Sequence, residues 1–175
     1  MGFDFVVISG GKAMRGPQSA GLLMGKKDII AAARLHMPPR GFNIGRGMKI
    51  NKEEIFGMYV ALEKYVNHDH DKDWKEWESG IAHIENSVNK IPGITTEVYV
   101  PPLGNHTPTL RVTWDVSKVK ITDKALREAM RNGNPSIEMG GGTANSVTIT
   151  VFMLKPGQEK IVATRLKDEL NKATA

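Results

Sequence analysis

No cysteine occurs among the 175 residues of the chain. Disulfides, thiolate metal ligands and cysteine nucleophiles are therefore excluded. No apolar run approaches the roughly 20 residues that cross a bilayer, and the start lacks a basic region followed by an apolar segment and a cleavage site. We therefore expect the protein in the cytoplasm, with no membrane partner.

The composition is typical of a globular chain. With 40% apolar and 25% charged residues, the chain has enough apolar material for one ordinary core, or for one core and a small appendage. The net charge of +5 is mild, and lysines and arginines are scattered among acids. This pattern favours a solvated surface; a nucleic-acid surface is the alternative.

The first chemical motif is a lysine that follows an apolar strand and a glycine turn. Residues 3–8 are mostly aromatic and β-branched, which predicts a buried strand, and the glycines that follow allow a sharp turn. A lysine just past such a turn lies at the rim of a sheet, where a neutral amine can form a Schiff base with a carbonyl. Lys12 is thus a candidate catalytic residue with Arg15 as a neighbouring cation, and a solvated turn lysine is the alternative. A phosphate loop is excluded, because Ala13 follows Lys12 where that motif needs serine or threonine.

These residues resemble a known family. Ser-Gly-Gly-Lys at 9–12, Arg-Gly-Pro-Gln at 15–18 and the segment 20–28 are similar to the lysine segment of the selenocysteine-synthase-like family. This family comprises fold type I enzymes that depend on pyridoxal phosphate, with a selenium transferase branch and an aminosugar-acid ammonia-lyase branch. The resemblance continues through 45–55 and more weakly through 133–135 and 154–157, so it covers nearly the whole chain.

The resemblance implies an α/β fold, specifically the C-terminal part of a fold type I transferase. It implies that Lys12 binds the cofactor aldehyde, and it extends the expected cofactor site to Ser9, Gly11 and Arg15. The expected substrate-binding residues are Gln18, Arg46 and Lys49. A hydrogen bond within the turn is the alternative explanation of Gln18.

One part of the family pattern has no counterpart here. In fold type I enzymes the phosphate cup, the ring-stacking residue and the aspartate that pairs with the pyridinium precede the lysine, yet only eleven residues precede Lys12. An extended strand rises roughly 3.3 Å per residue, so Asp4 would lie roughly 25 Å away. We therefore expect the C-terminal portion of an enzyme, completed by a homo-oligomer or by a partner chain that supplies the upstream half.

The chain is expected to divide near residue 48. Prolines and glycines at 37–47 interrupt regular structure, which separates a large-domain remnant (1–48) that carries the lysine from a small α+β domain (49–175). Helices are expected at 26–36, 73–90, 123–132 and 158–171. A further helix is expected to begin at Asn51, with an apolar face that includes Ile55, Met58, Tyr59, Leu62 and Val66. Strands are expected at 3–8, 19–24, 95–100, 109–115 and 146–153.

Three further features bear on chemistry. The run His68-Asp69-His70-Asp71 has no identifiable third ligand, so no metal is expected. His106 lies in a loop that either faces the active site or lies on the surface. Related enzymes often carry an arginine just after the turn that matches 133–135, but Glu138 stands nearby instead, which points away from an ordinary amino-acid carboxylate and toward a substrate such as a sugar acid phosphate.

The leading hypothesis is a pyridoxal-phosphate-dependent lyase or transferase that acts on a small amine-bearing substrate through Lys12. tRNA is a partner only in the transferase branch and is not favoured. The rival hypothesis is a non-catalytic orphan domain that serves in assembly or contacts RNA.

Overall fold

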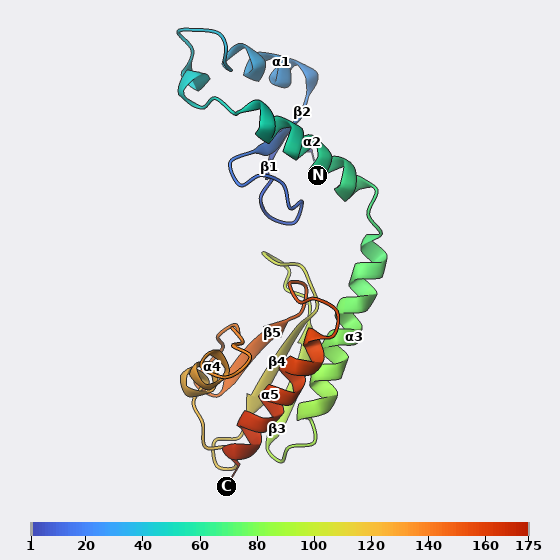
Figure 1. Cartoon of the computed structure of the whole chain (residues 1–175), viewed down its shortest axis with the longest axis vertical. Helices are drawn as coiled ribbons and strands as arrows, with labels where there is room; N and C mark the ends of the chain where they lie inside the picture. The colour runs from blue at the N-terminus through green and yellow to red at the C-terminus, as the bar shows by residue number, and fades with distance from the viewer. Residues whose placement is uncertain (1, 175) are drawn as a thin grey trace. The chain divides into compact units, whose positions relative to one another are not determined.

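The computed structural model of the protein describes residues 2–174, which pack as two compact units (Figure 1). Unit 1 ends at His68 and unit 2 begins at Asp69. The packing therefore places helix α2 (Lys52–Val66) with the residues that precede it. The assignment of 1–48 to a lysine-bearing domain and of 49–175 to a small domain concerns function, and it stays a prediction.

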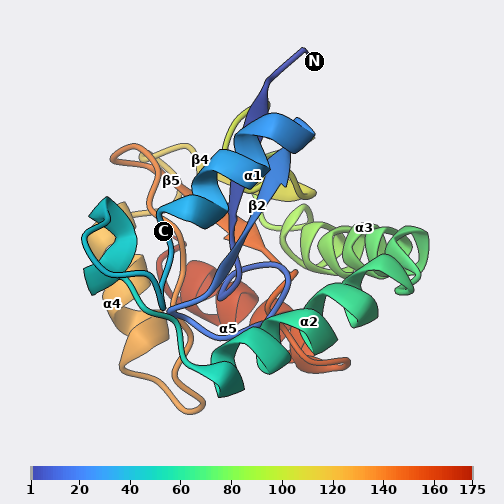
Figure 2. The same ribbon diagram turned by 90° about the horizontal axis from the view of Figure 1, so that it is seen from above.

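Unit 1 is built on a two-stranded antiparallel sheet. Strand β1 (Phe5–Ser9) pairs with β2 (Gly21–Gly25) along its whole length, and the two run side by side in Figure 2. Helix α1 (Lys27–Leu35) and the 3-10 helix η1 (Ile44–Gly47) follow before α2. The strands and the helix expected before residue 37 are confirmed, with ends that differ by one to two residues. The strand at 3–8 was predicted to be buried, and this is wrong, because Phe5, Val6 and Val7 are exposed in a sheet of only two strands.

Helix α2 begins where the sequence predicts a capping box. The backbone N–H of Asn51 donates to Glu54 Oε2 at 2.9 Å, which satisfies one amide at the helix start. Met58 and Ala61 are buried against the rest of unit 1. Three residues expected on the same apolar face are nevertheless exposed: Ile55, Tyr59 and Val66.

Unit 2 is a three-stranded antiparallel sheet, β3-β4-β5, with helices packed on it. Its elements in chain order are α3 (His70–Val88), β3 (Ile94–Tyr99), β4 (Thr109–Trp114), α4 (Asp123–Arg131), β5 (Ser146–Thr150) and α5 (Gln158–Lys172). Figure 1 shows α3 and α5 beside each other along the sheet. Side chains cap two of the helices: Asp69 Oδ1 accepts from Lys72 N–H, and Thr122 Oγ1 accepts from Ala125 N–H. All the elements expected after residue 72 are confirmed.

The core of the protein lies in unit 2. The helical spacing predicted for α3 buries Ile81, Ile84 and Val88, and alternate residues of β4 face the same core. Trp114 is 1% exposed, and its indole N–H donates to Ile121 O at 2.8 Å. The remaining members of this core come from α4, β5, α5, their flanking loops and the connection between α3 and β3: Ile91, Val119, Leu126, Met130, Met139, Val147, Ile149, Val151, Val162, Ala163, Leu166 and Leu170.

Unit 1 differs from unit 2 in both burial and charge. Among its described residues only Ala20, Met58 and Ala61 are buried hydrophobic residues. Unit 1 also has ten lysines and arginines against five acids, whereas unit 2 has equal numbers of each, so the whole net charge of +5 belongs to unit 1. The charge is therefore less evenly scattered than the sequence analysis concluded.

Across residues 2–174, none of the helices combines the length and the apolar character that crossing a bilayer requires.

Candidate active site

The Lys12 loop, residues 10–20, connects β1 to β2 and is closed by backbone hydrogen bonds. Gly10 N–H donates to Ala20 O at 2.9 Å, and Gly16 N–H donates back to Gly10 O at 2.8 Å. Within the loop, Arg15 N–H donates to Lys12 O at 2.8 Å and forms a tight turn. The lysine is therefore presented by a defined turn.

Glycine at position 10 is required by close packing. A Cβ there would lie 2.7 Å from Ala20 O and would overlap Met58 Sδ of α2. On the α2 side, a Cβ at Gly57 would lie 2.8 Å from Pro17 Cγ. These contacts leave no room for a side chain at either glycine, so the loop lies directly against α2.

The predicted cofactor residues lie on or beside this loop. Lys12 and Arg15 are exposed, Ser9 is the last residue of β1, and Arg15 has a φ of 54°, in the left-handed region. Gln18 Nε2 donates to Gly11 O at 3.2 Å, so the turn hydrogen bond expected as the alternative explanation of Gln18 is present. The structure thus brings Gly11 and Gln18 together within the loop.

A second tie between the loop and α2 escaped the sequence analysis. Ser19 Oγ donates to Glu54 Oε1, while Glu54 Oε2 accepts from Asn51 N–H. These two hydrogen bonds, that of Ser19 first, lower the pKa of Glu54 below its ordinary value. The ionised carboxylate of Glu54 therefore connects the start of α2 to the Lys12 loop, because it accepts one hydrogen bond from each. Glu54 was recognisable from the capping box, but its partner 35 positions away was not.

Ser19→Ala is expected to raise the pKa of Glu54 toward its ordinary value, because the hydroxyl that favours the ionised carboxylate is lost. Since the pKa is lowered in the folded protein, the tie contributes stability above the unfolded-state pKa and loses it as pH falls through the folded-state pKa. Carboxyl NMR titration measures this shift, and Ser19→Thr, which keeps a hydroxyl, is the control. An unchanged pKa in Ser19→Ala would contradict the assignment.

The predicted substrate residues Arg46 and Lys49 lie farther along unit 1. Arg46 belongs to η1, Lys49 follows it, and both are exposed. No hydrogen bond or ion pair within the described part of the chain joins either residue to the Lys12 loop. Asp4, by contrast, pairs with Lys26 Nζ at 2.5 Å, at the end of β1 opposite to the loop.

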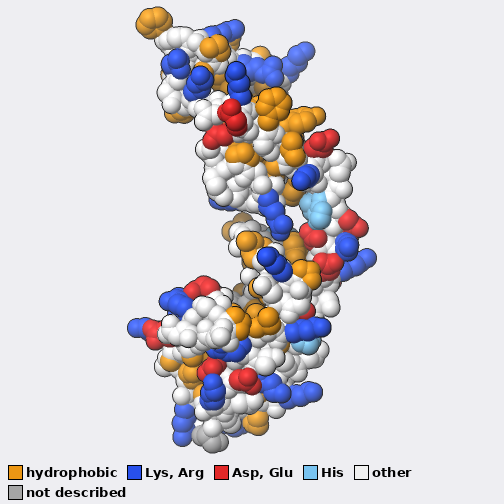
Figure 3. All heavy atoms as spheres, viewed as in Figure 1, with side chains coloured by type: hydrophobic (Ala, Val, Ile, Leu, Met, Phe, Trp, Pro, Cys, Tyr) orange, Lys and Arg blue, Asp and Glu red, His pale blue; other side chains and the backbone are white. Residues whose placement is uncertain are grey.

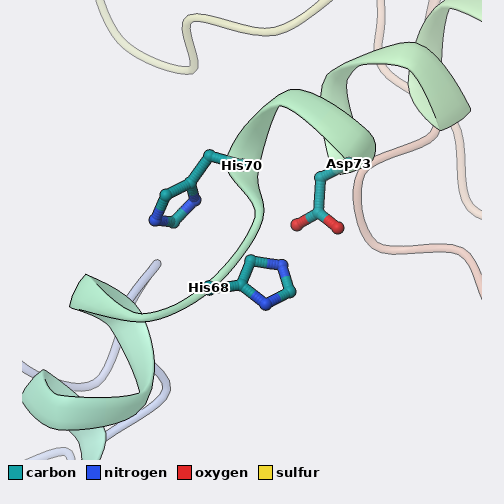
Figure 4. Close-up of side chains that lie close together, drawn as sticks. All are labelled: His68, His70 and Asp73. Atoms are coloured by element: carbon teal, nitrogen blue, oxygen red, sulfur yellow. The ribbon is translucent and has the colours of Figure 1, made fainter.

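A local cluster of possible metal ligands lies in the segment 68–73. One ligand atom each of His68, His70 and Asp73 lie within 4.8 Å of one another, and Figure 4 shows the two imidazole rings and the carboxylate around the start of α3. Asp73, one helical turn beyond His70, is the third candidate that was not identified from the sequence. The i, i+3 spacing on a helix was the signal that could have revealed it.

The turn at 133–135 in unit 2 is bonded by one arginine from α5 and flanked by an ion pair of Arg131 with Glu138. Arg165 of α5 donates to Pro135 O and to Ala129 O, each at 3.2 Å. Arg131 binds Glu138 through two hydrogen bonds of 2.7 Å each, which lower the pKa of Glu138. The negative charge at Glu138 is thus paired within unit 2.

His106 lies in an exposed loop of unit 2. Its Nδ1 is 3.2 Å from Pro101 O, and its ring centroid is 6.0 Å from that of Trp74. The sequence left two interpretations of His106 open, and its exposed side chain agrees with the surface loop. The Trp74 contact shows how the loop is attached to α3.

Three curated proteins are similar to nearly the whole chain or most of it. A Streptomyces 5'-C-glycyluridine monooxygenase-decarboxylase is 27% identical over 171 residues, which is 97% of this chain and 42% of that protein. D-glucosaminate-6-phosphate ammonia lyase of Salmonella typhimurium is 27% identical over 95% of this chain and 43% of its own length. L-seryl-tRNA(Sec) selenium transferase of Aquifex aeolicus is 26% identical over 78% of this chain and 32% of its own length. No family model matches the chain.

Solved structures share the fold. The structure of D-glucosaminate-6-phosphate ammonia-lyase aligns with a TM-score of 0.71 at 22% identity, over 98% of this chain and 45% of that one. SepCysS, in its complex with the SepCysE N-terminal domain, aligns with a TM-score of 0.57 at 15% identity, over 98% of this chain and 46% of that one. The chain thus spans less than half the length of these relatives. Its resemblance to the selenocysteine-synthase-like family, predicted from the Lys12 segment, is confirmed by the ammonia lyase and the selenium transferase among them.

Proposed function

We propose that this chain is the C-terminal portion of a fold type I, pyridoxal-phosphate-dependent enzyme of the selenocysteine synthase or aminosugar-acid ammonia-lyase type. The observation that carries the proposal is the exposed Lys12 on a loop closed by Gly10, Gly16 and Ala20, in a chain whose curated relatives include a lyase and a transferase. The hydrogen bonds that close the loop define the backbone from which the Lys12 amine extends, and a defined backbone position favours covalent attachment of a cofactor.

The residues present fit one part of this cofactor. A primary amine suits an aldehyde, and Arg15 in the same turn suits an anionic group of the bound molecule. Asp4, which pairs with Lys26 at the far end of β1, is not placed to act on a pyridine nitrogen next to Lys12. We therefore assign Lys12 the attachment role, with Ser9, Gly11 and Arg15 beside it, and leave the remaining contacts to another portion of the enzyme.

When bound, pyridoxal phosphate supplies an electron sink for reactions at an amine-bearing carbon. The residues of this chain bind, orient and move protons. Once the substrate amine has replaced it at the aldehyde, the freed Lys12 Nζ would take the proton from the carbon that bears the substrate amine and return one to the leaving group, as general base and then general acid. Loss of water or ammonia, or addition of a nucleophile in the transferase branch, follows from the same proton transfers.

Substrate contacts are assigned to Gln18, Arg46 and Lys49. The two cations suit a phosphate or carboxylate, and residues 136–139, just after the turn where related enzymes often carry an arginine, include no arginine but Glu138. This combination favours a sugar acid phosphate with an amine. We place the enzyme in the cytoplasm as a homo-oligomer or as a complex with the chain that supplies the upstream half.

The test is to incubate the purified chain with pyridoxal phosphate, reduce it with borohydride and map the modified peptides. We expect selective modification of Lys12, loss of that modification in Lys12→Arg, and no change in Lys27→Arg, a matched exposed lysine of the same unit. Equal labelling of many lysines, or the same yield in Lys12→Arg, would contradict the assignment. Salt-dependent RNA binding without such labelling would favour the non-catalytic alternative.

A further inference from the structure

The segment 68–73, which leads into α3, gathers imidazole and carboxylate groups. Two of the five histidines of the chain, His68 and His70, lie here with Asp73, and one ligand atom of each lies within 4.8 Å of the other two. Both histidines are exposed and Asp73 is partly buried. Figure 4 shows the three side chains around the first turn of α3, and Figure 3 shows histidine atoms (pale blue) and acidic side chains (red) at the surface in the same region. The cluster is therefore compact and open to solvent.

Hydrogen bonds define the backbone that carries the cluster. Asp69 Oδ1 accepts from Lys72 N–H at 2.9 Å, and Asp73 N–H donates to Asp69 O at 3.3 Å. His70 is the first residue of α3, so His70 and Asp73 are three positions apart on a helix and share one face. His68 precedes Asp69 directly. The three candidate ligands thus come from six consecutive residues, and the local chain sets their spacing.

Helix formation explains the acids of this segment but not its histidines. Asp71 and Asp73 lie in the first turn of α3, where carboxylates stabilise a helix through its dipole, and Asp69 already provides the cap. Histidine is a poor helix former, and a protonated histidine at a helix start is unfavourable. A neutral imidazole is, by contrast, the commonest metal ligand in proteins. The two histidines therefore indicate a role beyond starting α3.

The local charge of the segment suits a cation. Residues 68–73 contain three aspartates and one lysine, which gives a local charge of −2 when the histidines are neutral, although the net charge of the chain is +5. The amino end of a helix carries a partial positive charge of about half a unit. The surplus of carboxylates exceeds this charge, so a divalent ion meets net negative charge at the cluster.

The donor set selects the class of metal ion. The cluster offers two imidazoles and one carboxylate, whereas Mg²⁺ and Ca²⁺ take oxygen ligands. Zn²⁺ binds imidazole nitrogens and carboxylate oxygens, and its bonds of about 2.0–2.2 Å place the ligand atoms of a tetrahedral site about 3.3 Å apart. The spread of up to 4.8 Å is wider by about 1.5 Å, which rotation of exposed imidazoles about their side-chain torsions can close.

We infer that His68, His70 and Asp73 form a zinc-binding site, with water as the fourth ligand. One Zn²⁺ binds per chain and stabilises the start of α3, and no reaction is assigned to it. This proposal replaces the expectation of no metal, which rested on the lack of a third ligand. It is independent of the proposed cofactor at Lys12, because none of the three ligands belongs to the Lys12 loop.

The test is isothermal titration calorimetry of the full chain with Zn²⁺, in the absence of pyridoxal phosphate. We expect one ion per chain, and no displacement of Zn²⁺ by a large excess of Mg²⁺. Histidine NMR locates the ion: the ring signals of His68 and His70 are expected to shift on addition of Zn²⁺, whereas those of His83 stay in place.

Matched variants sharpen the result. His68→Gln, His70→Gln and Asp73→Asn each remove one ligand, and each is expected to weaken Zn²⁺ binding about tenfold or more, since even the partners of metal ligands contribute that much. His83→Gln changes an exposed histidine of the same helix, and Asp71→Asn changes an exposed aspartate of the same turn. Both controls are expected to bind Zn²⁺ within about twofold of the parent chain, because an isolated exposed charge contributes little.

His68→Gln also separates loss of a ligand from loss of the helix. His68 lies outside α3, so weaker binding in this variant, with an unchanged circular dichroism spectrum, reports the ligand itself. Absence of Zn²⁺ binding, equal affinity in all five variants, equal competition by Mg²⁺, or one ion shared between two chains would overturn the inference.

Discussion

Gly10→Ala is expected to reduce the rate of pyridoxal phosphate modification at Lys12 about tenfold or more, because a displacement near 1 Å is enough to disrupt a reactive geometry. The added methyl group would overlap Met58 Sδ and would lie 2.7 Å from Ala20 O. Relief of that overlap must move Gly10 and weaken the two hydrogen bonds that close the loop. The measurement is the rate of borohydride-trapped labelling, with amide exchange of Gly16 as a readout that needs no cofactor.

Gly41→Ala is the matched control for this substitution. Gly41 lies in unit 1, and a Cβ built there meets no heavy atom within 4 Å. Its labelling rate and the exchange of Gly16 are expected to equal those of the parent chain. If Gly10→Ala matches Gly41→Ala in both readouts, the closed loop does not position Lys12.

Leu166→Ala is expected to lower the free energy of unfolding of unit 2 by about 2–5 kcal/mol, the usual effect of removing a buried leucine side chain. Leu166 is fully buried in the core formed by α3, α5 and the sheet. Tryptophan fluorescence during urea unfolding of the full chain measures the change, because all three tryptophans belong to unit 2.

Ile161→Ala on the same helix is the control for packing. Ile161 is 42% exposed, so its replacement is expected to cost less than about 1 kcal/mol. A similar shift of the unfolding midpoint for both variants would mean that α5 does not pack as described.

The elements of unit 2 could be predicted from the sequence because local pattern and tertiary packing agree there. The spacing of Ile81, Ile84 and Val88 is that of a helix with one buried face, and the alternation in β4 is that of a strand with one buried face. Each pattern needs only one covering layer, which unit 2 itself supplies. Local rules therefore sufficed for the order and type of its elements.

Helix α2 shows where the same reasoning is insufficient. The spacing of Ile55, Tyr59 and Val66 predicted a helix correctly, but periodicity does not state whether the covering layer lies within the chain. These side chains are exposed, so the spacing predicted the helix but not the exposure of this face. The segregation of charge was missed because it appears only after the division at His68 is known.

Those parts of the candidate site that are formed by neighbouring residues of one segment could be predicted from the sequence. The turn that presents Lys12 follows from adjacent glycines, whereas the tie between Ser19 and Glu54 joins positions 35 residues apart and depends on how the loop packs against α2. For the same reason Asp73 was within reach of a local argument, because the i, i+3 spacing from His70 is fixed by the helix.

The two free edges of the β1–β2 hairpin have a consequence for the abundance of the protein in the cell. Exposed Phe5, Val7 and Met24 and unpaired strand edges are features that chaperones and proteases recognise, and they offer pairing to other copies of the chain. The amount of folded protein that accumulates is therefore expected to depend more on the exposure of unit 1 than on the stability of the core in unit 2.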